Sequence, residues 1–166
     1  MYKNIVTTAI RLKEFQWTEK FINEYKPLLP PDEQHNAYAY NLAAWYHAQN
    51  DYRNALFQLQ DVEFTDTSYH LGAKIIQLKS YYELDEEEAF YALVEAFKKY
   101  NYRSKDLSDY RKKANDNFLK IAKKIFQIKI RRDKSFSQKK KNVDKMLGET
   151  EPIANKGWLE ECMEEF

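Results

Sequence analysis

The chain has 166 residues, with three glycines, four prolines and one cysteine, and its formal net charge at pH 7 is +1. So few turn-forming residues argue against short strands joined by tight turns, and a lone cysteine excludes an internal disulfide. The sequence shows neither a signal-peptide pattern at its N-terminus nor a run of 18 apolar residues, so we expect a soluble cytoplasmic protein that does not enter a membrane.

The first hundred residues are predicted to form a series of short helices. Apolar side chains recur every three or four residues, and Ala, Leu, Lys, Glu and Gln favour helix. Acidic residues that precede several of these segments are expected to serve as N-caps, namely Asp32, Asp51, Asp66 and Asp85. The predicted helices span residues 3–13, 16–28, 33–48, 52–61, 68–83 and 86–100.

A longer helix is predicted over residues 105–131, where apolar residues from Leu107 to Ile128 step by three and four along one stripe. The basic stretch that follows is either a mobile linker or a weak helix that runs to about Leu147. GETEPIANKG reads as a loop, and WLEECMEEF as a short amphipathic helix in which Cys162 is a buried apolar residue. We therefore divide the chain into a helical array with its capping helix, 1–131, and a C-terminal segment, 132–166.

Charge is distributed unevenly along the chain. Residues 1–97 hold 8 basic and 15 acidic residues, residues 98–145 hold 18 basic and 5 acidic ones, and residues 146–166 hold 1 basic and 6 acidic ones. The chain is thus an acidic block, a basic block and an acidic tail, and the basic block is a candidate binding surface.

Part of the helical pattern repeats. Ala55 and Leu59 recur as Ala89 and Leu93, at an offset of 34 residues. Further upstream, KEFQWTEKFINEYKPLLP aligns with NDYRNALFQLQDVEFTDT. The best copy carries large residues around small ones on both sides of a turn, and its pattern consists of Leu42, Tyr46, Asn50, Asp51, Tyr52, Ala55, Leu59 and Val62. Small residues allow two helices to approach closely, so the pattern predicts a helical hairpin.

These residues resemble the tetratricopeptide repeat over residues 2–100, as three units. The resemblance implies an all-α fold: a right-handed array of antiparallel helical hairpins, an α-solenoid, with a long C-terminal capping helix. It also implies a concave groove lined by the first helix of each pair, which holds a peptide or a partner protein. The groove residues carried over by alignment are Lys3, Arg11, Tyr40, Asn41, His47, Lys74 and Tyr81. Cations beside aromatic rings suit an acidic and aromatic peptide.

The predicted function is accordingly that of a non-catalytic scaffold or adaptor. The alternative is a nucleic-acid-associated accessory protein that uses the basic stretch 98–145, because clustered cations can follow a phosphate backbone. A homodimer formed through an end of the array is a further expectation for the partners. The basic patch of the alternative comprises Lys112, Lys113, Lys120, Lys123 and Lys124.

An enzymatic function is not indicated by the sequence. The three glycines are isolated, so no phosphate-binding loop is present, and the histidines at 35, 47 and 70 are too far apart in sequence for a metal-binding motif. His47 is expected to be an ordinary surface or groove histidine. We expect no cofactor, no metal and no catalytic residue.

Overall fold

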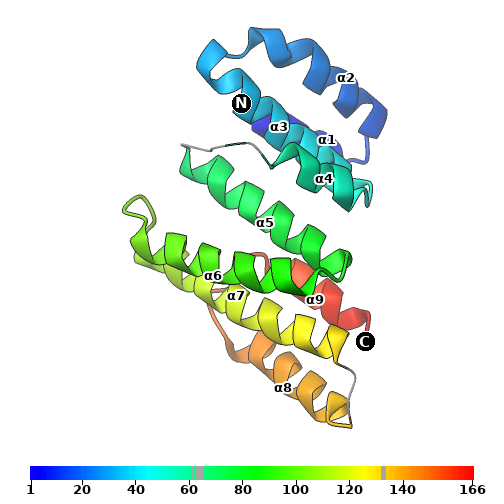
Figure 1. The fold of residues 1–166 in the computed structure, drawn as a ribbon, viewed down its shortest axis with the longest axis vertical. Helices are drawn as coiled ribbons and strands as arrows, with labels where there is room; N and C mark the ends of the chain where they lie inside the picture. The colour runs from blue at the N-terminus through cyan, green and yellow to red at the C-terminus, as the bar shows by residue number, and fades with distance from the viewer. Residues whose placement is uncertain (61, 63–65, 132–133) are drawn as a thin grey trace. The chain divides into compact units, whose positions relative to one another are not determined.

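The computed structural model describes the whole chain except residues 61, 63–65, 132 and 133. The described residues form nine α-helices and one short 3-10 helix, with no strand among them, which confirms the prediction of an all-α fold (Figure 1). The chain divides into two compact units, Met1–Glu86 and Glu87–Phe166. The sequence analysis placed its boundary after residue 131 instead.

The first unit is built around its longest helix, α3, which packs against every other helix of the unit. Figure 1 shows α3 alongside α1 and α4. Consecutive helices pair in sequence order, as the hairpin prediction requires, whereas the right-handed sense of the array stays a prediction. The helices of this unit are α1 (Tyr2–Arg11), α2 (Phe15–Tyr25), the 3-10 helix η1 (Lys26–Leu28), α3 (Pro31–Ala48), α4 (Tyr52–Gln58) and α5 (Thr67–Glu83).

Three helices of the first unit end in the same turn. After α1, α3 and α5 the chain places one residue at positive φ, namely Lys13 (60°), Asn50 (63°) and Asp85 (56°). The amide of the next residue then donates to a carbonyl five residues earlier, at 3.0 Å in all three turns. This pattern is a Schellman motif, which satisfies the last carbonyls of a helix. The recurrence of one turn geometry supports a repeated hairpin plan.

The same turns correct the predicted register of the third copy. The turn residues Asn50 and Asp85 are 35 positions apart, so the offset of 34 that pairs Ala55 with Ala89 is wrong by one residue. With an offset of 35, Ala55 and Leu59 correspond to Phe90 and Val94, and all four are buried. The sequence comparison favoured Ala89 because an identical residue outweighed a buried apolar one.

Two of the predicted helix caps are confirmed and two are wrong. Asp51 accepts a hydrogen bond from the Asn54 amide at 3.2 Å, and Asp66 accepts one from the Tyr69 amide at 2.9 Å. Asp32 instead lies in the first turn of α3, because Pro31 occupies the first helical position. Asp85 takes the left-handed turn conformation, and α6 begins two residues later.

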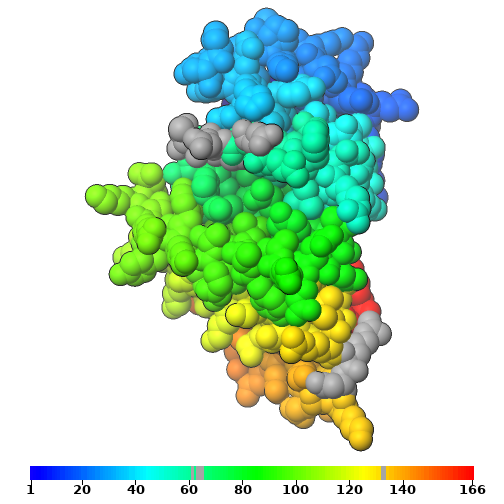
Figure 2. Space-filling model, in the orientation of Figure 1, coloured from blue at the N-terminus to red at the C-terminus, as the bar shows by residue number. Residues whose placement is uncertain are grey.

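The second unit is built around α7, which packs against α6, α8 and α9. On the face drawn in Figure 2, the side chains of α6 (green) and α7 (yellow) form a continuous surface. The predicted stripe of α7 is its core: Phe118, Ile121, Ile125 and Ile128 are buried. The helices of this unit are α6 (Glu87–Arg103), α7 (Asp109–Ile130), α8 (Phe136–Glu149) and α9 (Lys156–Glu164).

The segments flanking α7 settle two further predictions. The helix begins at Asp109 rather than at residue 105, because the Ser108 hydroxyl caps it by accepting from the Arg111 amide. Among the described residues of the basic stretch, helix α8 confirms the helical alternative. The predicted linker positions 132 and 133 lie outside the described residues. Cys162 is buried on α9, as expected.

Candidate functional site

The first turns of α1, α3 and α5 surround a cavity of about 420 Å³ in the first unit. Because α1 and α5 each pack against α3, residues far apart in sequence meet there. The side chains that line it are mostly polar, and they come from Lys3 and Asn4 on α1, from Asp32, Glu33 and Asn36 on α3, and from Asp66, Ser68 and Tyr69 around the start of α5. This cavity is the candidate binding site.

Lys3 closes one side of the cavity through contacts within the chain. Its Nζ atom donates to the Ser68 hydroxyl at 2.9 Å and to the Ser68 carbonyl at 3.1 Å. The same atom lies 4.7 Å from the ring centroid of Tyr40 and 4.9 Å from that of Tyr69, so it makes two cation–π contacts. Burial lowers the pKa of Lys3, and Asp66 opposes this effect. The ammonium group therefore already has partners inside the protein.

Tyr40 joins the cavity to the core of the first unit. Its ring meets Tyr69 edge to face, with the centroids 5.0 Å apart. It also lies directly against Gly72 of α5: a Cβ atom at position 72 would be 2.5 Å from Tyr40 Oη. Only a residue without a side chain fits there. Burial, assisted by the nearby Tyr69, raises the pKa of Tyr40 to about 12, so the hydroxyl stays neutral.

Asn41 and His47, both predicted groove residues, make local contacts along α3. The fully buried Asn41 donates from Nδ2 to the Ala37 carbonyl at 2.7 Å. His47 is half-buried, and its ring meets Tyr52 edge to face at 5.3 Å. Burial, together with Lys79, lowers the pKa of His47 to about 4, so the ring is neutral at pH 7. Neither residue lines the cavity.

The remaining predicted groove residues also lie away from the cavity lining. Arg11 is exposed at the end of α1, and Tyr81 is half-buried near the end of α5. Lys74 is half-buried, and burial lowers its pKa. Counted from the turn residues, Ile75 rather than Lys74 is the equivalent of Lys3 and Tyr40, since the third copy is shifted by one.

Several cavity residues were missed as candidates by the sequence reasoning. Asp32 and Asp66 were interpreted only as helix caps, and Glu33, Ser68 and Tyr69 were not singled out. A signal was present, because the first turn of each groove helix carries polar residues, but first-turn acidic residues are common in any helix. The cavity wall has three carboxylates and one ammonium group, so its charge is negative rather than positive.

The predicted basic patch lies on α7 and divides into two stripes. Lys113, Lys120 and Lys124 are exposed and separated by seven and four residues, so they share one side of the helix. Lys112 and Lys123 share a neighbouring side, and both are half-buried. Lys112 donates to the Tyr102 carbonyl at 3.5 Å.

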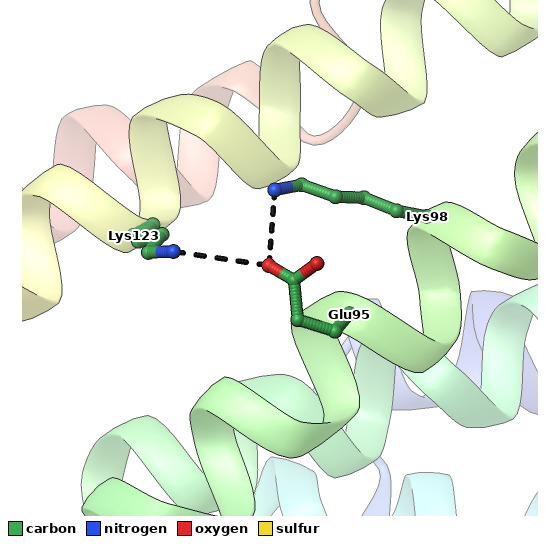
Figure 3. A network of polar contacts seen from close by, with 3 residues as sticks. All are labelled: Glu95, Lys98 and Lys123. Atoms are coloured by element: carbon green, nitrogen blue, oxygen red, sulfur yellow. Dashed lines mark hydrogen bonds and ion pairs between the residues drawn. The ribbon is translucent and has the colours of Figure 1, made fainter.

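Lys123 is held by the neighbouring helix. Its Nζ lies 3.7 Å from Glu95 Oε1, and the same oxygen accepts from Lys98 at 3.2 Å (Figure 3). The hydrogen bond from Lys98, and the charges of both lysines, lower the pKa of Glu95. Lys123 also lies 5.5 Å from the ring centroid of Tyr91. The exposed stripe, not Lys123, is therefore the part of the patch that faces solvent.

Two searches of the described residues and a comparison with other proteins complete the description. Within the described ranges, no helix has the length and hydropathy needed to cross a bilayer. In the same ranges, no group of three or more His, Cys, Asp or Glu side chains is placed to hold a metal ion. Comparison of the chain with protein-family models, with curated proteins and with solved structures found no significant match in any of the three. The tetratricopeptide resemblance stays a prediction.

Proposed function

We propose that the chain is a non-catalytic adaptor of the cytoplasm, with a right-handed array of tetratricopeptide type that binds a segment of a partner protein. The observation that carries this proposal is the cavity among α1, α3 and α5. It combines hydrogen-bonding side chains with the aromatic ring of Tyr69, which are the features that orient a bound peptide. No catalytic role is assigned to any residue of the cavity.

The charge of the cavity favours a partner segment with a Lys or Arg side chain. Asp32, Glu33 and Asp66 attract a cation, whereas Lys3 is already engaged by Ser68 and two rings. A bound ammonium or guanidinium group gains carboxylate contacts and a nearby aromatic face. This preference is opposite to the acidic peptide expected from Lys3, Arg11 and Lys74 alone.

The test is a peptide array probed with the purified protein and with the triple variant Asp32→Asn, Glu33→Gln, Asp66→Asn. These changes remove the charge, and Asn at position 66 keeps the N-cap of α5. The wild type should select basic peptides that contain Lys or Arg, and the variant should lose them by at least about tenfold in affinity. A matched control neutralises Glu19, Glu161 and Glu165, which are exposed elsewhere.

Selection of no peptide, or equal binding by the triple variant and the wild type, would contradict the proposal. A pull-down from lysate, with and without nuclease and at two salt concentrations, then identifies the natural partner. The triple variant provides the specificity control in that experiment.

The second candidate function, binding of nucleic acid, rests on the lysines of α7 and α8. Lys124 and Lys139 come from different helices and line one small cavity of about 160 Å³ in the second unit. The pair Lys120→Glu, Lys124→Glu should abolish nucleic-acid binding under this reading and leave peptide selection unchanged. Binding should also weaken steeply with salt. Retention of nucleic acid by this variant would exclude the exposed stripe as the binding surface.

A further inference from the structure

An apolar groove runs along α1 beside the start of α2 in the first unit. It has a volume of about 590 Å³, and its walls include Ile5, Thr8, Ala9, Leu12 and Trp17. The four α1 residues follow the spacing i, i+3, i+4 and i+7, so they form one stripe on the helix. This stripe is separate from the polar cavity on α1, α3 and α5, which the proposed function uses.

Large apolar side chains on this face are open to solvent. Leu12 is 69% exposed and Trp17 is 49% exposed. Trp17 stacks on Phe21 at 5.0 Å, and Phe21 stacks on Tyr25 at 4.3 Å, so α2 adds a row of rings beside the α1 stripe. Exposed apolar surface of this extent and continuity marks an interaction site.

We propose that this face is the interface of a homodimer, in which the α1 helices of two copies pack antiparallel across a two-fold axis. The argument is the size pattern of the stripe, which reads large, small, small, large for Ile5, Thr8, Ala9 and Leu12. A two-fold axis between Thr8 and Ala9 places Leu12 of each copy opposite Ile5 of the other. The small residues meet at the crossing point, where helices need to approach closely.

The charges around this face are compatible with two identical copies. Residues 11–24 contain three basic side chains, Arg11, Lys13 and Lys20, and three acidic ones, Glu14, Glu19 and Glu24. The face is therefore neutral, whereas the first unit as a whole is acidic. The antiparallel arrangement also places Lys13 of one copy opposite the uncharged Asn4 of the other. Repulsion between copies is thus smaller here than at the acidic cavity.

The size of the face sets the expected strength. The exposed parts of Met1, Leu12, Trp17 and Tyr25 amount to roughly 400 to 500 Å² per copy. Two copies then bury roughly 800 to 1,000 Å², which is near the lower limit for specific interfaces. The dimer is therefore weak, with a dissociation constant in the micromolar range, and it is largely independent of salt because it is apolar.

Analytical ultracentrifugation of the full chain from about 1 to 300 μM tests the proposal. The wild type should show a monomer–dimer equilibrium, and Leu12→Glu should weaken it at least about tenfold by placing a charge in the apolar groove. Phe57→Glu on α4 is the matched control, since Phe57 is 66% exposed. The control should dimerise like the wild type. Circular dichroism verifies that both variants keep their helical content.

A crosslinking experiment tests the geometry independently. Cys162 is buried and is the only cysteine, so Thr8→Cys introduces the one reactive thiol of that variant. A short bismaleimide should link two copies through position 8, which lies beside the two-fold axis, and should not link copies of Phe57→Cys. Absence of the position-8 crosslink would overturn the antiparallel arrangement.

Three results would overturn the homodimer itself: a wild type that stays monomeric at every concentration, a dimer that Leu12→Glu leaves unchanged, or a dimer lost only at high salt. A monomeric chain whose Leu12→Glu variant loses a specific partner protein would assign the face to that partner instead. The peptide array on the acidic cavity gives a separate result, so failure of one proposal does not decide the other.

Discussion

The two units bury aromatic rings in different ways. In the first unit, Tyr40 lies against Gly72, under the ammonium group of Lys3 and beside Tyr69. In the second, Phe90 stacks on Phe126 at 4.2 Å, inside a core supplied by the apolar stripe of α7. A tyrosine buries its ring and keeps a polar tip, whereas a phenylalanine offers nothing to a polar ligand. The first unit can therefore present a binding cavity, and the second presents lysines only on its outside.

The buried polar groups of the second unit strengthen this contrast. Asn101 donates to the Lys112 carbonyl and to Asp116, both at 2.8 Å, and accepts from Asn115 at 3.0 Å. All of these contacts join α6 to α7 and close on one another. Such a network specifies how two helices pack but leaves no group for a ligand. Polar burial in the second unit is structural, whereas that in the first unit surrounds a cavity.

The largest expected effect is on the core of the second unit. Phe126→Ala removes a fully buried ring and its stacking on Phe90, so we expect a loss of about 3 to 5 kcal/mol in the free energy of unfolding. Tyr110→Ala, on the same helix but exposed, should change it by less than about 0.5 kcal/mol. Denaturant unfolding followed by circular dichroism measures both. Equal effects of the two variants would refute the assignment of the α7 stripe as the core.

The next effect is the acid sensitivity of the first unit, through His47. Its pKa is about 4 in the folded protein and about 6.5 in the unfolded chain, so the unfolded state binds the proton more readily. Stability is unaffected above pH 6.5 and falls as the pH drops toward 4, by about 2 kcal/mol at pH 5. His47→Phe should remove this component, and His35→Phe, at an exposed position of the same helix, should not.

Unfolding curves of the three proteins at pH 7 and pH 5 give the comparison. If wild type and His47→Phe lose the same stability between these pH values, the neutral, buried state of His47 is wrong.

A smaller effect is expected where Tyr40 meets Gly72. Gly72→Ala places a Cβ atom 2.5 Å from Tyr40 Oη and forces the ring to move. Overpacking costs about 1 to 3 kcal/mol, and the better helix propensity of alanine offsets up to about 1 kcal/mol of it. Tyr40→Phe removes the closest atom, so the double variant should recover part of the loss. Denaturant unfolding of the two single variants and the double variant forms a double-mutant cycle, and strict additivity would contradict this contact.

The smallest effect is expected at the surface contact of the second unit. Glu95→Gln breaks the attachment of Lys98 and Lys123 to one carboxylate (Figure 3), but the groups are exposed, so the free energy of unfolding should change by less than about 1 kcal/mol. Thermal unfolding at low and high salt measures it. A loss as large as that of Phe126→Ala would mean that charge, rather than the apolar stripe, joins α6 to α7.

Much of the local structure was predictable because it depends on neighbours in sequence. The caps at Asp51 and Asp66 follow from a side chain that reaches an amide three residues away, and the stripe of α7 follows from helical spacing. Errors arose where two local signals competed. Asp85 looks like a cap, but the Schellman turn needs that residue at positive φ.

The candidate site was predicted only in part. Lys3 and Tyr40 were selected and do meet at the cavity, but Asn41 and His47 are directed into contacts along α3. Lys74 was selected from an offset that is one residue too short. The residues that give the cavity its negative charge were interpreted as features of helix ends. Local sequence shows that a residue caps a helix but not what else lies beside it.

The sequence by itself determined that the chain is helical, where most helices begin and end, and that lysines lie outside the α7 stripe. These properties depend on interactions within a few residues, so periodicity and capping encode them. Only the tertiary structure decided that Lys3 reaches Ser68, 65 positions away, and that Asp32, Glu33 and Asp66 share one cavity. Those contacts depend on how three helices pack, and packing fixes both the charge of the cavity and which cations are already satisfied.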